Sequence, residues 1–77
     1  MTEHVSMPPA WADLAEAITI LGQHPTDPVS PLHCEHDRLN VLADDKAFTS
    51  AELARLAGLG FHVSAEGGFH SYRFGSA

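Results

Sequence analysis

The most constraining feature of the sequence is a helix whose beginning and end are both encoded. Thr49, followed three residues later by Glu52, forms a capping box in which each side chain accepts a hydrogen bond from the other residue's backbone N–H. Phe48 and Leu53 flank the box as a hydrophobic staple, and Gly60 suits the left-handed turn that ends a helix. In a chain of 77 residues, this helix limits where the neighbouring strands lie.

An apolar stripe predicts an earlier helix over residues 10–22. Its members follow the spacing of one helical face: Trp11, Leu14, Ala15, Ile18 and Leu21. We expect Pro9 or Ala10 to open this helix and Gly22 to end it. Proline then recurs at every third position, at 25, 28 and 31, which predicts a rigid, extended surface connector over residues 24–32.

Three segments have the composition or alternation typical of strands: 38–43, 61–63 and 69–74. Gly67 and Gly68 supply the positive φ of a tight hairpin between the last two. The order helix, strand, helix, strand, strand predicts an α+β fold: a single small domain over residues 10–77, with two helices on one face of a three-stranded sheet, after a disordered tail over residues 1–9. Either the second strand returns parallel to the first, or the third strand lies between them as an antiparallel centre.

The formal charge of −6 is concentrated in the first half of the chain. Residues 1–37 contain no Lys or Arg and six acids, namely Glu3, Asp13, Glu16, Asp27, Glu35 and Asp37, whereas residues 38–77 balance four acids with four bases. Nucleic-acid binding needs clustered Lys and Arg, so we expect no nucleic-acid partner. The acidic half is either a solvated surface or a face that meets a basic protein, for which Asp13 and Glu16 are the candidate contacts.

Cysteine content and hydropathy indicate the compartment. The single Cys34 excludes an intrachain disulfide and fits a reducing environment. The first residues lack the pattern of a signal peptide, and no stretch approaches 18 consecutive apolar residues. We therefore expect a cytoplasmic protein with no membrane contact. A domain this small needs metal, a second subunit or close packing, and an exposed sheet edge makes a homodimer reasonable.

Five consecutive residues before the first predicted strand can bind metal, exchange protons or act as nucleophiles: His33, Cys34, Glu35, His36 and Asp37. Side chains alternate in extended chain, so Cys34 and His36 share one side and the other three share the opposite side. We expect His33, Glu35 and Asp37 either to anchor the loop by hydrogen bonds or to contribute to a protein contact.

Zinc accepts thiolate and imidazole ligands and usually takes four. Cys34 and His36 supply two of them, and His62 and His70 could complete the site if the sheet brings them beside the cluster. The separated ligand pairs of zinc ribbons and fingers do not occur in the sequence. Zinc is therefore one candidate cofactor, while hydrogen-bonded or exposed side chains account for the same residues without a metal.

We expect no enzymatic activity. The sequence has no Walker loop, dinucleotide glycine pattern or His-Glu-x-x-His motif, and a Cys-His nucleophile would need a pocket and oxyanion donors that so small a domain hardly offers. Tyr72 and Arg73 belong to residue types favoured at interface hot spots, so they are candidates for a partner contact. Alternatively, Tyr72 and Phe74 close the core and Arg73 pairs with an acid.

The polar run at 33–37, the Leu-Gly-Phe at 59–61 and the Ser-Tyr-Arg-Phe-Gly-Ser at 71–76 carry a resemblance. The chain resembles, over about residues 11–77, a group of small uncharacterised proteins encoded mostly by bacteriophages of actinobacteria and related bacterial genomes. The resemblance implies a phage or phage-derived origin, and it implies no activity and no site residue. We therefore expect a small accessory protein that binds a protein partner, such as a host protein. The alternative is a small zinc-stabilised domain.

Overall fold

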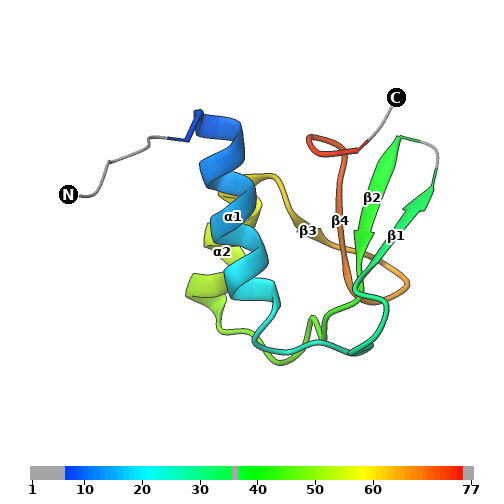
Figure 1. Cartoon of the computed structure of the whole chain (residues 1–77). Coiled ribbons are helices and arrows are strands. Elements are labelled where there is room, and N and C mark those ends of the chain that lie inside the picture. The colour runs from blue at the N-terminus through cyan, green and yellow to red at the C-terminus, as the bar shows by residue number, and fades with distance from the viewer. Residues whose placement is uncertain (1–6, 36, 76–77) are drawn as a thin grey trace.

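The computed structural model describes residues 7–35 and 37–75. It contains helix α1 (Pro9–Leu21), strands β1 (Leu32–Glu35) and β2 (Arg38–Val41), helix α2 (Ser50–Leu59), and strands β3 (His62–Val63) and β4 (Phe69–Ser71). Both helices lie on one side of the sheet (Figure 1). The predicted α+β class is confirmed. Of the predicted N-terminal tail, residues 1–6 lie outside the described residues, and residue 9 already belongs to α1.

The sheet is antiparallel throughout, with the strand order β1-β2-β4-β3. Since β4 lies between β2 and β3, the second of the two predicted arrangements is correct. The predicted count of three strands is wrong, because the chain from Leu32 onward pairs with β2. The last proline of the connector, Pro31, directly precedes β1, where its missing N–H leaves the ladder intact.

Two strands are shorter than predicted. β2 stops at Val41, beyond which the chain bonds to the proline connector: the Leu42 N–H donates to the Pro31 carbonyl over 2.8 Å. β4 stops at Ser71, whose Oγ accepts a hydrogen bond from the Phe74 N–H over 3.2 Å. This side-chain bond to the backbone bends residues 72–75 away from the strand direction.

Helix α2 has both predicted ends. The Thr49 Oγ accepts from the Glu52 N–H over 3.1 Å, and the Glu52 carboxylate accepts from the Thr49 N–H over 2.9 Å. At the other end Gly60 has φ 100°, and the Phe61 N–H donates to the Leu56 carbonyl over 2.8 Å. These bonds form a Schellman close, which turns the fully buried Phe61 into the core.

Helix α1 lies where it was predicted, but its buried face differs. Ala17 and Leu21 are buried, whereas Trp11 is 67% exposed and Ile18 is 43% exposed. Helix α1 contacts α2, and an ion pair between Glu16 and Arg55 joins the two helices. The prediction of one continuous apolar stripe was therefore wrong, because the contact between the helices selects a narrower face.

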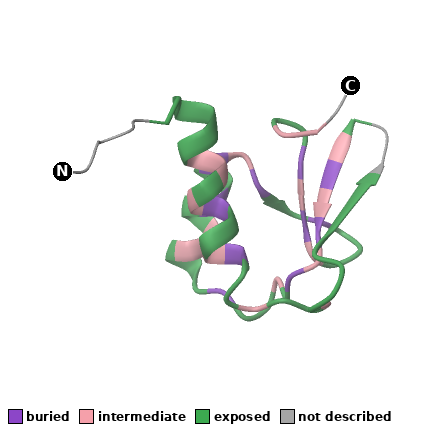
Figure 2. Ribbon diagram, viewed as in Figure 1, coloured by how far each residue is buried: buried purple, intermediate pink, exposed green. Residues whose placement is uncertain are grey.

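The core lies between the helices and one face of the sheet (Figure 2). Aromatic rings dominate it: Phe48 meets Phe69 edge-to-face with ring centres 5.4 Å apart, and Phe61 stacks on Phe74 at 5.4 Å. Its buried apolar members are Ala17, Leu21, Leu39, Val41, Ala43, Phe48, Leu56, Leu59, Phe61 and Phe69. Because the core takes up one face of the sheet, the opposite face is left to polar side chains.

Candidate functional site

Four polar side chains cross the face of the sheet that is opposite the core. His33 on β1 pairs with Asn40 on β2, Asn40 pairs with His70 on β4, and His70 pairs with His62 on β3. Residues directly opposite each other in antiparallel strands project their side chains from the same face. We call His33, Asn40, His62 and His70 the polar row. Alternation in the sequence distinguishes the core positions of each strand from the outward positions. The register between strands then places the four residues of the polar row side by side.

An open hollow of about 670 Å³ lies beside the polar row. Its lining includes His33 and Asn40 of the row together with Arg38 of β2 and Glu66 of the β3–β4 turn. The Arg38 guanidinium lies 3.9 Å from the Glu66 carboxylate. Arg38, Asn40 and Glu66 were not among the predicted site residues. Their positions beside the hollow depend on which strands pair. The sequence did not predict the pairing of β1 with β2, so these residues were not identified.

His70 is a half-buried titratable group on this face. Its Nδ1 lies 2.8 Å from the Ser64 Oγ, and its ring centre lies 5.9 Å from that of His62 and 5.7 Å from that of Tyr72. Burial lowers the pKa of His70, the positive charges of Arg38 and His62 lower it further, and Glu66 partly opposes them. These surroundings therefore favour the neutral form of the His70 imidazole.

The lowered pKa of His70 predicts a loss of stability on mild acidification. Below about pH 6.5 the unfolded chain protonates this residue, whereas the folded protein keeps it neutral until its lower pKa is reached. The unfolded state therefore binds more protons than the folded state in this window. As a result, the free energy of unfolding decreases as the pH is lowered. Urea melts of the wild type and of His70→Gln between about pH 7 and about pH 5 should show the steeper loss in the wild type. Equal losses would contradict this.

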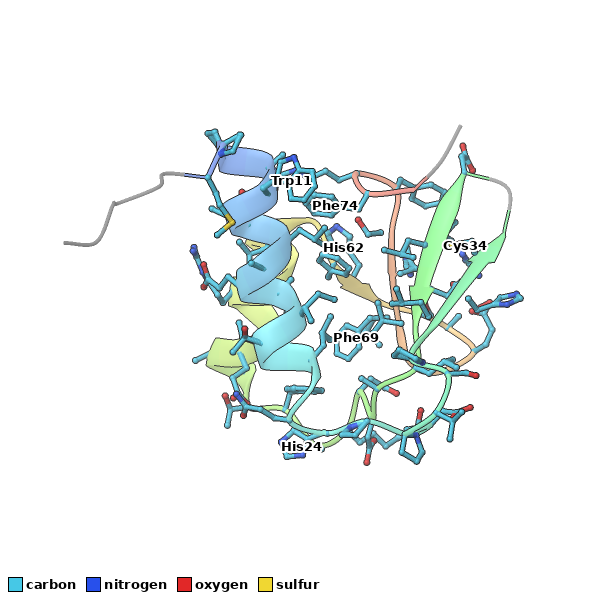
Figure 3. The ribbon with its side chains drawn as sticks, viewed as in Figure 1. Trp11, His24, Cys34, His62, Phe69 and Phe74 are labelled. Carbon is cyan, nitrogen blue, oxygen red and sulfur yellow. The ribbon has the colours of Figure 1, made fainter. Side chains whose placement is uncertain are left out.

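The residues of the predicted zinc site are divided by the sheet. His62 and His70 lie side by side, but Cys34 pairs with Leu39 and so projects from the core-side face. Figure 3 shows Cys34 and His62 well apart, on the two outer strands. His36 lies outside the described residues. Within residues 7–35 and 37–75, no three or more His, Cys, Asp or Glu side chains gather as metal ligands.

The predicted acidic contacts have partners within the chain. Glu16 receives two hydrogen bonds of 2.6 Å from Arg55, and this pairing lowers the pKa of Glu16. Asp13 accepts from Arg73 over 2.9 Å, and the same Arg73 nitrogen donates to the Leu59 carbonyl over 3.1 Å. These bonds tie α1 to α2 and to the C-terminal segment. The alternative in which Arg73 pairs with an acid is therefore confirmed, and an open acidic patch at Asp13 and Glu16 is not.

The other predicted contact residues are distributed around the sheet. Tyr72 lies beside His70 and is 61% exposed, so it does not close the core. Phe74, in contrast, packs against the core. Asp37 is exposed in the turn between β1 and β2, and Glu35 is the ladder partner of Arg38. Among the predicted residues whose side chains the structure describes, His33, His62, His70 and Tyr72 project from the uncovered face or stand beside it.

Comparison with known proteins adds no functional assignment. No protein-family model matches the chain, and no curated protein or solved structure is significantly similar to it. Neither helix in the described part of the chain has the length and apolar character needed to cross a membrane.

Proposed function

We propose that the protein is a non-enzymatic binding module that contacts a protein partner through the uncovered face of its sheet. The observation that carries this proposal is the polar row, which presents hydrogen-bonding side chains from all four strands on one face of the sheet. We further propose that the module is a small accessory protein of the phage type, and that its partner is a protein of the host cytoplasm.

The chemistry of the face suits a protein surface rich in oxygen acceptors. Imidazoles and the exposed Tyr72 hydroxyl offer hydrogen-bond donors, and the Arg38 guanidinium, 3.9 Å from the Glu66 carboxylate, adds a positive charge. The whole chain, in contrast, carries a formal charge of −6. Complementary charge and hydrogen bonding steer association, so this face is better suited to an acidic partner surface than the remainder of the molecule.

Two exposed aromatic residues provide a matched test of the contact surface. Tyr72 stands beside the polar row, whereas Trp11 lies on α1, and their exposures are similar at 61% and 67%. Because aromatic hot spots typically contribute more than 1 kcal/mol, Tyr72→Ala should weaken capture of the partner by about fivefold or more. Trp11→Ala should leave capture unchanged. Immobilised protein is incubated with host lysate, and the retained partner is quantified by mass spectrometry for the wild type and both variants.

The reverse pattern, with capture lost in Trp11→Ala and kept in Tyr72→Ala, would move the contact to the helical side and contradict the proposal. A homodimer is the competing partner, since β1 is an edge strand and edge strands can pair with a second chain. Light scattering during size-exclusion chromatography measures the mass directly. A stable dimer whose interface includes the polar row would leave no free face for another protein.

A further inference from the structure

We propose that His62 and His70 form a binding site for a divalent transition-metal ion of the class that prefers imidazole ligands, such as zinc. The two residues are direct partners in the antiparallel ladder between β3 and β4. Directly opposed residues on such a ladder have Cβ atoms about 5 Å apart and project from the same face. The two imidazoles therefore stand side by side on the uncovered face.

The spacing of the rings is within the reach of one ion. With a zinc–nitrogen bond of about 2.1 Å, the ion stands about 3 Å from the centre of each ring. The ring centres of His62 and His70 are 5.9 Å apart, and the rings are inclined by 42°. A tetrahedral angle at zinc requires centres about 5 Å apart, which a small rotation of the exposed His62 side chain supplies.

A hydrogen bond with Ser64 orients the imidazole of His70. The Ser64 Oγ lies 2.8 Å from the Nδ1 of His70, and Ser64 is itself buried. Metal-binding histidines usually bond their other ring nitrogen to a protein oxygen in this way, which fixes the tautomer and the direction of the ring. With Nδ1 engaged, Nε2 is the nitrogen of His70 that faces the ion.

The surroundings allow a bound cation but limit its affinity. Arg38 places a positive charge near His70, and Glu66, 3.9 Å from Arg38, offsets it. Two imidazoles fill half of a tetrahedral shell, and water or a group of a bound partner completes it. This site needs neither Cys34 nor His36, and it binds metal whether or not the uncovered face also binds a protein.

The test is titration of the full-length protein with zinc alone, followed by calorimetry and by NMR of the histidine rings. We expect one zinc per chain at this site, shifts centred on the rings of His62 and His70, and no comparable binding of magnesium, which prefers oxygen ligands. His62→Gln and His70→Gln should each weaken zinc binding by more than about tenfold, and Ser64→Ala by about tenfold.

His33→Gln is the matched control, because His33 lies on the same face but at its far edge, on β1. It should bind zinc as the wild type does. His62 is exposed, so His62→Gln keeps the fold and remains decisive even if His70→Gln is destabilised. The proposal is overturned if His62→Gln binds zinc with unchanged affinity, or if zinc shifts the rings of other histidines and leaves those of His62 and His70 unmoved.

Discussion

Replacing Phe61 with alanine is expected to destabilise the domain by about 3–5 kcal/mol. Phe61 is completely buried, it stacks on Phe74, and it follows directly after the turn that closes α2. Truncation removes the apolar surface of the ring and leaves a cavity that the fixed turn at Gly60 prevents from collapsing. A domain of 77 residues has a total stability of about 4–12 kcal/mol, so this loss is a large fraction of the free energy of unfolding.

Urea denaturation followed by circular dichroism measures the effect of Phe61→Ala. Val63→Ala, two positions along the chain, is the control: Val63 is 46% exposed, and its truncation should change the free energy of unfolding by less than about 1 kcal/mol. Phe61→Leu keeps most of the volume and should fall between the two. A loss below about 1 kcal/mol for Phe61→Ala would show that the ring is not packed as described.

The second large effect is expected at Gly68, where alanine should destabilise the domain by about 2–3 kcal/mol. Gly68 has φ 76°, a backbone conformation that residues with a Cβ rarely adopt, and an added Cβ would lie 2.9 Å from the Val41 carbonyl oxygen. The Gly68 N–H also donates to the Asp45 carboxylate over 3.1 Å. The substitution therefore pushes apart β2 and the start of β4, where the central pairing of the sheet begins.

The neighbouring Gly67 separates the two causes of this loss. It has φ 99°, but the nearest atom to an added Cβ is the Asp45 carboxylate oxygen at 3.9 Å. Gly67→Ala should therefore lose only the conformational contribution, about 1 kcal/mol. Thermal unfolding of both variants measures the difference. Equal losses of stability in the two variants would mean that the close approach of Gly68 to Val41 does not contribute to the effect of Gly68→Ala.

The parts of the fold that were predicted correctly depend on neighbours in sequence. The capping box of Thr49 and Glu52 and the left-handed Gly60 act within one helical turn, so they identify both ends of α2. The predicted buried face of α1 was partly wrong because it depends on the partner helix α2: Ala17 is fully buried, whereas Trp11 is 67% exposed. The local sequence pattern predicts a helix or strand, but the elements that pack against it determine which of its faces is buried.

The candidate site was harder to predict than the fold, for the same reason. The choice of His62 and His70 as neighbours follows from a short hairpin, and the register places them directly opposite each other. Cys34 was assigned to the same site, but its strand pairs with β2 so that the thiol projects from the other face. The prolines before residue 32 predicted an extended connector and no strand, so β1 was missed. Extended chain becomes a strand only when another strand bonds to it, and β2 does so here.

The central position of β4 makes the two halves of the sheet depend on a single late segment of the chain. Three residues, Phe69–Ser71, bond to β2 on one side and to β3 on the other, so among the described residues the hairpin of β1 and β2 joins the rest of the sheet through them alone. Without this segment, strand pairing in the described part of the chain would be limited to the β1–β2 hairpin, and β3 would have no partner strand. Folding should therefore be all-or-none, and any proposed ligand of His62 and His70 would stabilise the whole domain by clamping its last strand.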